Sequence, residues 1–314
     1  MIEVKNVTKR YGKTIAVDDI SFSIKEGEIV GLLGPNGAGK STTMNMITGF
    51  IESSEGEIFV NGFDISKKSK KAKRNIGYMP ENVPLYTDLT VREFVTYMAE
   101  IKLVDRKTRK EKVSKIIEQT GLLDVEKKLI RNLSRGYKQR VSMAGALVGE
   151  PKILILDEPT VGLDPKQITE IRSLIKELGK THTIILSSHI LSEVSQICNK
   201  VIIINKGKIV ATDTPENLEK KMSSNNMIYL TIEDVDGNIE KIKNNIKEIK
   251  TIKLVEKLED GTKKYVIETE NETDLRKTIF SECTKKNIVI FEMKKADITL
   301  EDAFMKIIEG GETK

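Results

Sequence analysis

A glycine-rich segment at residues 34–41 is the part of the chain where residue types and spacing most clearly predict chemistry. It matches the pattern G-x-x-x-x-G-K-[ST] and consists of Gly34, Pro35, Asn36, Gly37, Ala38, Gly39, Lys40 and Ser41. Glycines let backbone N–H groups surround phosphates because no Cβ atom obstructs the approach. Lys40 would hold the terminal phosphates, and the hydroxyl of Ser41 would bind Mg²⁺. The segment, to which we add Thr42, therefore predicts a site for the phosphates of a nucleotide and for Mg²⁺.

Two neighbouring carboxylates, Asp157 and Glu158, form the second candidate. They follow four aliphatic residues at 153–156 and precede Pro159. Parallel sheets place ligand sites at the carboxyl ends of their strands, where this pair would lie. We expect Asp157 to belong to the Mg²⁺ shell and Glu158 to polarise the attacking water. Acidic residues often end strands, so this assignment depends on the phosphate-binding segment earlier in the chain.

The composition disfavours zinc and disulfide chemistry. The chain has two histidines and two cysteines, Cys198 and Cys283, without the spacing of a zinc site. Hydrolysis would therefore depend on carboxylates and phosphate-binding elements. The few cysteines also indicate a reducing compartment.

Further motifs give the chain a resemblance to a known family. Residues 133–140 read LSRGYKQR, which is similar to the signature motif of ATP-binding cassette (ABC) ATPases. Four other positions agree with the family in order and spacing: Tyr11 for the aromatic residue that stacks on adenine, Glu81 for the Q-loop glutamine, Asp164 for the D-loop and His189 for the switch histidine. The resemblance covers about residues 1–215.

This resemblance implies an ATP site shared by two subunits. In the family, each ATP lies between the phosphate loop of one subunit and the signature motif of the other. Ser134 and Gly136 would then contact the γ-phosphate held by the partner, as the start of a helix does for an anion. Intact motifs on one chain favour a homodimer, although the sequence leaves a heterodimer open.

The resemblance also implies a role for each site residue. The catalytic residues would be Lys40, Glu158 and His189. The metal ligands would be Ser41, Asp157 and Glu81. For His189, a structural position at a strand end is the alternative to a hydrogen bond with the γ-phosphate. His182 lies in no motif, and we expect it to be structural or exposed.

The chain departs from the family pattern at three positions in two motifs. Arg135 and Tyr137 occupy signature positions where glycine and glutamine are usual, and Glu81 replaces a glutamine. Because Ser134 and Gly136 remain, we expect the contact with the partner's nucleotide to survive. Arg135 would either add a charge near the phosphate or face solvent. The departures resemble those of a bacterial exporter branch.

The elements that must position these residues are predicted by hydrophobic pattern. Strands are expected at residues 2–7, 15–24, 28–33, 152–156, 183–187 and 201–205, with helices at 40–48 and 165–178. Residues 85–150 read as a helical subdomain, in which the capping box at 90–93 opens a helix to about 102. Alternating strands and helices indicate an α/β fold, and the resemblance implies a P-loop NTPase cassette with a mixed or largely parallel sheet.

A change in composition near residue 222 predicts a second domain. All seven prolines lie at or before Pro215, so the later part has fewer turn signals. We expect strands at 227–232, 251–258, 264–269 and 287–292, helices at 238–249 and 272–286, a turn at Asp260 and Gly261, and a closing helix at 299–308. This order is that of an α+β, ferredoxin-like domain. The predicted domains are thus 1–221 and 222–314, the latter serving packing, dimerisation or ligand sensing.

Charge and hydropathy bear on the partners. The longest apolar runs have four residues, whereas a spanning helix needs about 20. A separate transmembrane permease is therefore implied as partner, placing the chain in the cytoplasm on the inner face of the membrane. The net charge of +5 and the basic cluster at 67–74 are typical of a solvated surface, with anionic lipid or nucleic acid as alternatives. We expect no nucleic acid, and a soluble ABC ATPase acting on nucleic acid or ribosomes is the alternative function.

Overall fold

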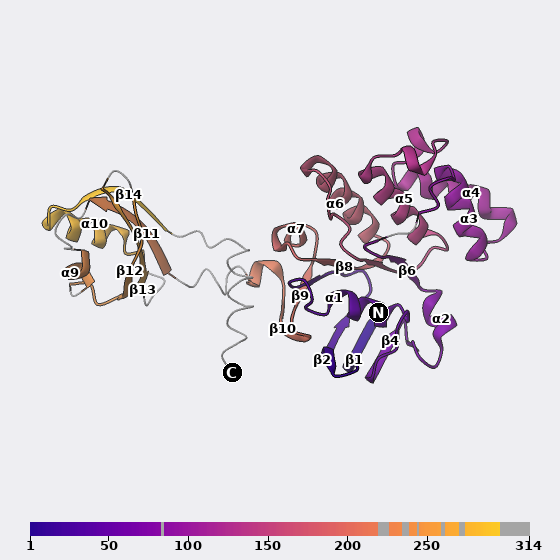
Figure 1. The fold of residues 1–314 in the computed structure, drawn as a ribbon, viewed down its shortest axis with the longest axis horizontal. Coiled ribbons are helices and arrows are strands. Elements are labelled where there is room, and N and C mark those ends of the chain that lie inside the picture. The colour runs from indigo at the N-terminus through magenta and orange to yellow at the C-terminus, as the bar shows by residue number, and fades with distance from the viewer. Residues whose placement is uncertain are drawn as a thin grey trace. The chain divides into compact units, whose positions relative to one another are not determined.

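The computed structural model describes residues 1–82, 85–218, 226–233, 239–243, 245–258, 261–269 and 274–295. They form two compact units, one up to Pro215 and one from Glu216 onward (Figure 1). The domain boundary that we expect near residue 222 lies outside the described residues and stays a prediction.

A six-stranded sheet forms the centre of the first unit. Its order is β10-β9-β3-β8-β7-β6, and all neighbouring pairs are parallel except β10 with β9. The strands are β3 (Ile29–Leu33), β6 (Ile76–Met79), β7 (Ile153–Leu156), β8 (Thr183–Ser188), β9 (Lys200–Asn205) and β10 (Lys208–Asp213). Every residue of β3, β7 and β8 is buried, as in a sheet covered on both faces. The prediction of a mixed, largely parallel sheet is confirmed.

A second, antiparallel sheet packs on the first around helix α1. It has the order β2-β1-β4-β5, with β1 (Ile2–Tyr11), β2 (Thr14–Ile24), β4 (Glu55–Val60) and β5 (Phe63–Asp64). Helix α1 (Lys40–Ile47) contributes Met44 and Ile47 to a core that also contains residues of both sheets. The short helix α2 (Ser69–Lys73) follows β5. This core fixes the helix that begins directly after the phosphate-binding segment.

The predicted helical subdomain is present as three helices and two short 3-10 turns. They are α3 (Val91–Ile101), α4 (Arg106–Gln119), the turns Leu123–Val125 and Ile130–Asn132, and α5 (Arg135–Leu147). The capping box is confirmed, because Thr90 accepts from the backbone of Glu93 and the Glu93 carboxylate accepts from the Thr90 N–H at 2.8 Å. In the first unit these helices lie on the side of the parallel strands opposite β1, β2 and β4 (Figure 1).

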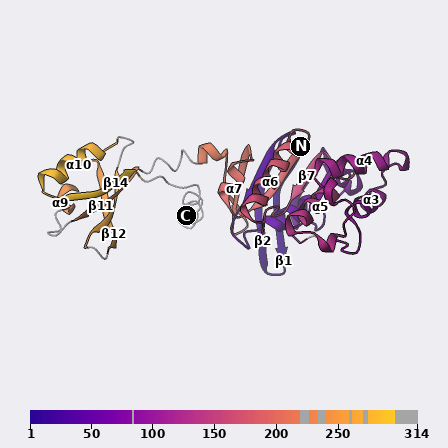
Figure 2. The same cartoon turned by 90° about the horizontal axis from the view of Figure 1, so that it is seen from above.

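Two more helices complete the first unit. Helix α6 (Pro165–Gly179) begins at Asp164, whose carboxylate accepts from the Gln167 N–H at 2.9 Å. Helix α7 (Leu191–Ser195) follows β8. Figure 2 shows α6 beside α5, so the two helices that start near the carboxyl ends of the strands are neighbours.

The second unit consists of an antiparallel sheet and two helices that share one hydrophobic core with it. Its strands are β11 (Asn226–Glu233), β12 (Ile249–Lys257), β13 (Lys263–Thr269) and β14 (Val289–Lys295), in the order β12-β13-β11-β14. Helices α9 (Ile239–Lys243) and α10 (Arg276–Lys285) contribute Ile239, Ile242 and Ile279 to that core. The order of elements and strands is that of the split βαβ pattern.

One helix prediction in this unit is wrong at its end. The helix expected at 238–249 ends at Lys243, and Ile249 already pairs with Thr269 as the first residue of β12. The Asn245 N–H bonds the Ile242 carbonyl at 3.0 Å, which turns the chain so that Ile246 and Ile249 reach the core. The predicted closing helix at 299–308, and Asp260 of the predicted turn, lie outside the described residues.

Candidate functional site

The phosphate-binding segment is a tight loop between β3 and α1. Gly37 and Gly39 have φ angles of 78° and 107°, which glycine adopts without the steric cost that Cβ imposes on other residues. A Cβ atom on Gly39 would also lie 2.7 Å from the carbonyl oxygen of Ala16 on β2. Both backbone shape and space therefore require glycine at position 39.

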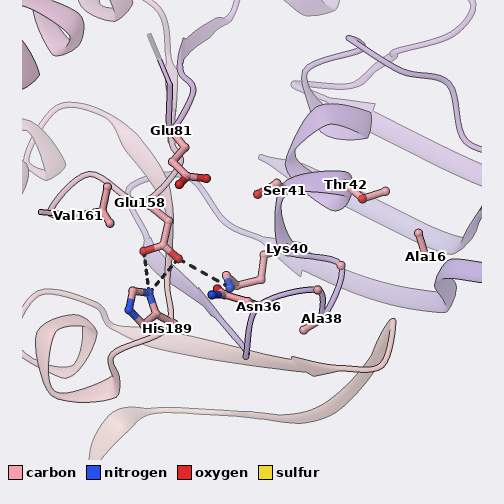
Figure 3. Close-up of a pocket in the computed structure, with 12 residues that line it drawn as sticks. Ala16, Asn36, Ala38, Lys40, Ser41, Thr42, Glu81, Glu158, Val161 and His189 are labelled. Carbon is pink, nitrogen blue, oxygen red and sulfur yellow. Dashed lines mark hydrogen bonds and ion pairs between the residues drawn. The ribbon is translucent and has the colours of Figure 1, made fainter.

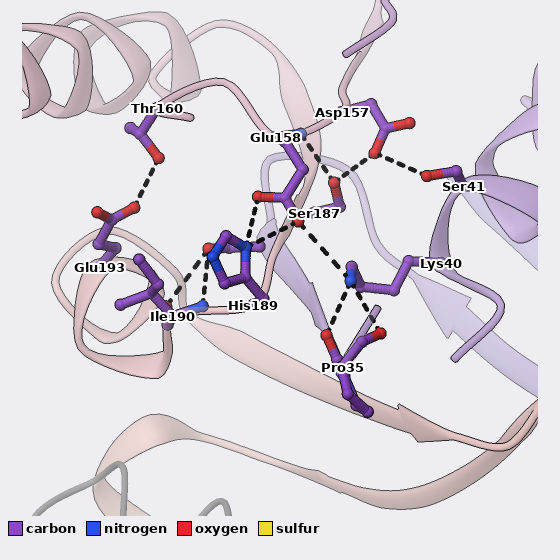
Figure 4. A network of polar contacts seen from close by, with 12 residues as sticks. Pro35, Lys40, Ser41, Asp157, Glu158, Thr160, Ser187, His189, Ile190 and Glu193 are labelled. Carbon is purple, nitrogen blue, oxygen red and sulfur yellow. Dashed lines mark hydrogen bonds and ion pairs between the residues drawn. The ribbon is translucent and has the colours of Figure 1, made fainter. Parts of the chain in front are cut away.

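Lys40 is a buried cation at the first turn of α1. Its ammonium donates to the carbonyls of Gly34 at 2.8 Å and Pro35 at 3.3 Å, and lies 3.7 Å from Glu158 Oε1 (Figure 4). Only 7% of the Lys40 side chain is exposed. The loop thus holds a positive charge at its own centre, where a bound phosphate would meet it.

Asp157 and Glu158 are held together by a hydroxyl from the neighbouring strand. Ser187 on β8 donates to Asp157 Oδ1 at 2.5 Å and accepts from the Glu158 N–H at 2.8 Å. Asp157 Oδ1 also accepts from Ser41 Oγ at 3.3 Å, which joins the strand end to the phosphate loop. Sequence reasoning missed Ser187; the available signal was a hydroxyl residue at the end of a buried strand beside the one that carries the carboxylates.

Glu158 contacts His189 directly. The imidazole Nδ1 lies 3.1 Å from Glu158 Oε2 and 3.3 Å from Oε1. Glu158 is buried and has a φ of 48°, an uncommon conformation for a residue other than glycine that often occurs at functional sites. The imidazole itself is 43% exposed. A buried carboxylate is thus oriented between a lysine ammonium and an accessible histidine.

These groups open into a hollow of about 320 Å³. It is lined by Ala16, Asn36, Gly37, Ala38, Gly39, Lys40, Ser41, Thr42, Glu81, Glu158, Val161 and His189 (Figure 3). Glu81, which comes from the segment after β6, extends into the same space as Ser41 and Glu158. The structure therefore gathers the predicted phosphate-loop, Q-loop, acidic and histidine positions around one space.

Three other predicted residues lie around a different hollow. Ser134, Gly136 and Asp164 line a space of about 290 Å³ between the starts of α5 and α6, which no residue of the phosphate loop lines. Ser134 caps α5 by accepting from the Tyr137 N–H at 3.4 Å. Tyr11 lines neither hollow: it is 51% exposed and its ring lies 5.2 Å from the Lys9 ammonium.

The two signature departures have defined contacts. The Tyr137 hydroxyl donates to Asp124 Oδ2 at 2.6 Å, and this hydrogen bond raises the pKa of the tyrosine. The Arg135 side chain is exposed, and its guanidinium lies against the backbone of Gly162. The expectation that Arg135 faces solvent therefore holds only in part.

The fold and this arrangement define a P-loop nucleotide hydrolase. A buried parallel strand, a glycine-rich loop with its lysine, and a helix N-terminus form a phosphate site, and an acidic pair follows β7, two strands away in the same sheet. Figure 4 shows the lysine and the hydroxyl of the loop directed toward these carboxylates.

Comparison with known proteins identifies the family. Residues 17–161 match the family model for ABC transporters. The chain is 36% identical over 322 residues to the bacitracin transport ATP-binding protein BcrA of Bacillus licheniformis, covering 99% of this chain and 98% of that protein. It is 38% identical over 237 residues to the linearmycin resistance ATP-binding protein LnrL of Bacillus subtilis (strain 168), covering 75% and 76%.

Solved structures agree. The cbiO1 subunit from Clostridium perfringens matches with a TM-score of 0.65 at 30% identity, covering 78% of this chain and 95% of that one. The ATP-binding cassette MJ0796, in a dimeric post-hydrolysis state with ADP and phosphate, matches with a TM-score of 0.62 at 28% identity, covering 68% and 98%. The chain belongs to the family of ABC transporter ATP-binding proteins, and it binds and hydrolyses ATP. Within the described ranges, no helix combines the length and apolarity needed to cross a membrane.

Proposed function

We propose that this chain is the ATP-hydrolysing subunit that drives a separate transmembrane exporter, and that it works as a dimer with two shared ATP sites. The observation that carries the proposal is the division of the predicted nucleotide contacts between two hollows of one unit. Two chains paired head to tail would join the first hollow of each to the second hollow of the other. ATP then favours the closed dimer because only that state contacts it from both sides. The intact motifs favour a homodimer.

Within each shared site, we assign the chemistry to residues around the first hollow. Lys40 would bind the β- and γ-phosphates and neutralise charge that develops during transfer. Glu158 would orient and polarise the attacking water, and His189 would contact the γ-phosphate from its exposed side. Ser134 and Gly136 of the partner subunit would complete the site. Tyr11 would stack on adenine from β1.

The residues present also fit a Mg²⁺ ion. Ser41 Oγ and Asp157 Oδ1 lie 3.3 Å apart and Glu81 lines the same hollow, so hard oxygen donors are available. Among the described residues, no group of three or more His, Cys, Asp or Glu side chains is arranged to hold a metal alone. That agrees with an ion carried largely by the phosphates. When bound, Mg²⁺ would neutralise phosphate charge.

Exposed aromatic residues that follow Glu81 in the chain support the proposal of a protein partner. Tyr86 is 52% exposed and meets Tyr97 edge to face, with ring centroids 5.2 Å apart. Exposed aromatic residues are typical anchors of protein interfaces. A transmembrane permease seated here would keep the chain at the inner face of the cell membrane. The relatives' names, which refer to bacitracin transport and linearmycin resistance, support export.

The partner is tested by recovering tagged full-length protein from mildly solubilised cells. We expect it to co-purify with a polytopic membrane protein, and Tyr86→Ala should reduce that recovery several-fold. Leu123→Ala removes another exposed apolar side chain of the helical subdomain and serves as the matched control. Recovery with ribosomes or nucleic acid, without a membrane protein, would contradict the proposal.

A further inference from the structure

We propose that Arg135 is a positioning residue that couples the ATP bound by one chain to the signature helix that the same chain presents to its partner. The inference rests on the shared-site dimer proposed above and goes beyond it. It concerns a side chain that departs from the family pattern and that does not line the first hollow.

The proposal rests on the contact between Arg135 and Gly162. A Cβ atom built on Gly162 would overlap the guanidinium, meeting its Cζ and both Nη atoms at almost equal distances. The planar group therefore lies flat on the glycine backbone. Gly162 has a φ of 67°. Both its conformation and the arginine above it favour glycine at this position.

Two further contacts, close to the one between Arg135 and Gly162, connect α5 to the segment after β7. Gln139, one turn after Arg135, donates from Nε2 to the Pro159 carbonyl at 2.9 Å. On another side of α5, the side-chain amide of Gln167 on α6 packs against Gly136, only 2.8 Å from the position that a Cβ on Gly136 would take. The start of the signature helix is thus held against residues 159–167 at three points.

The same segment begins at the catalytic carboxylate. Residues 158–164 run from Glu158 to the cap of α6 through two turns, in which the Val161 N–H bonds the Glu158 carbonyl at 3.2 Å and the Leu163 N–H bonds the Thr160 carbonyl at 3.3 Å. Val161 lines the first hollow beside Glu158 (Figure 3). Any movement of Glu158 on binding ATP is therefore passed to Gly162, and from Gly162 to Arg135.

The chemistry of arginine suits this role. A guanidinium is planar and weakly hydrated, so it stacks on a peptide surface, whereas a lysine ammonium is a compact charge without that shape. Because Arg135 is the first residue of α5, directly after Ser134, its position sets the part of the signature motif offered to the partner. Loss of the contact would leave each site able to bind ATP but less responsive to the other.

The test is the dependence of ATP hydrolysis on ATP concentration for the full-length chain. We expect Arg135→Ala to lower kcat about tenfold and to reduce the Hill coefficient, because coupled contacts of this kind change the coupling between sites by amounts of that order. Affinity for a fluorescent ATP analogue and the thermal unfolding midpoint should stay at wild-type values. Arg135→Lys should recover little of the loss. Arg131→Ala, which removes an arginine paired with Asp88 on the surface, is the matched control.

A double-mutant cycle on kcat distinguishes loss of the contact between Arg135 and Gly162 from nonspecific loss of activity in each single variant. Gly162→Ala should also lower kcat, because its Cβ displaces the guanidinium, and adding Arg135→Ala should cost little more. Fully additive losses, or a wild-type Hill coefficient in Arg135→Ala, would overturn the inference. The shared-site dimer is checked separately: ATP-dependent dimerisation of Glu158→Gln supports it whatever Arg135 does, and its absence removes the basis for coupling.

Discussion

At the residue scale, one carboxylate organises the hydrolytic site. Glu158 lies between the ammonium of Lys40 at 3.7 Å and the imidazole of His189 at 3.1 Å. The γ-phosphate of ATP would compete with Glu158 for both partners, which would free the carboxylate to orient water. The spacing of Lys40, Glu158 and His189 was predictable from motifs that the chain shares with its family. Their direct contact was not, because it depends on the φ of 48° at Glu158.

Lys40 should be indispensable for nucleotide binding. Replacing it with alanine removes the cation that the loop holds beneath the phosphates, so we expect binding of a fluorescent ATP analogue to fall at least about a hundredfold, as for the loss of a buried charge contact. Lys70→Ala, on the surface helix α2, is the control and should bind normally. Unchanged binding in Lys40→Ala would contradict the assignment of the loop.

Ser187 should matter for turnover rather than for affinity. Ser187→Ala removes the hydroxyl that joins the Asp157 carboxylate to the Glu158 backbone, leaving Asp157 short of a donor at 2.5 Å. We expect kcat to fall roughly tenfold, since misplacing catalytic groups by a fraction of an ångström carries costs of this order. Steady-state kinetics measure this. The control is Ser188→Ala, whose hydroxyl instead accepts from the Ile190 N–H at 3.0 Å; equal losses in both variants would contradict the role of Ser187.

At the element scale, hydrophobic pattern predicted most of the buried strands and the capped helices, but not β6, a short, largely buried strand at the edge of the parallel sheet. Strands β3, β7 and β8 are short, largely aliphatic segments whose side chains are all buried, as expected for the interior of a sheet. Helix α3 begins at a capping box. Strand β10 was not predicted, because its residues 208–213 alternate weakly and are half exposed. A turn signal was nevertheless present at Lys206 and Gly207, whose φ angles of 47° and 79° suit a two-residue hairpin.

Lys102 joins two elements of the helical subdomain and should make stability depend on pH. It caps α3 and donates to the carbonyls of Ala146 and Val148 at the end of α5, at 3.2 and 2.8 Å. Burial lowers the pKa of Lys102 to about 8. The folded state therefore loses this proton at lower pH than the unfolded state, and the free energy of unfolding should rise as pH increases from about 8 to 10.5.

Urea unfolding of the wild type and Lys102→Met measures this difference. The stability of the wild type relative to Lys102→Met should increase across that range by only a fraction of the roughly 1.4 kcal/mol that one unit of pKa difference corresponds to, because Lys102 is exposed overall and solvent screens the effect. A difference that stays constant or falls with pH would contradict the lowered pKa.

At the scale of the whole molecule, the first unit places the predicted nucleotide contacts around two separate hollows. The family resemblance predicted this division, with Ser134 and Gly136 assigned to the partner's nucleotide. The hollow that holds Lys40 and Glu158 is lined by neither signature residue, which supports the shared site that we propose. Pattern alone could not show that Arg135 contacts Gly162, since that contact joins residues from separate elements.

The most direct test of the account is the oligomeric state of Glu158→Gln with and without ATP. This variant keeps the phosphate loop and the signature motif but lacks the carboxylate to which we assign the polarisation of water, so bound ATP should persist and hold two chains together. Light scattering coupled to gel filtration should show a monomer without nucleotide and a dimer with ATP, and adding Ser134→Arg should prevent the dimer. A Glu158→Gln protein that binds ATP and remains monomeric would contradict the shared site.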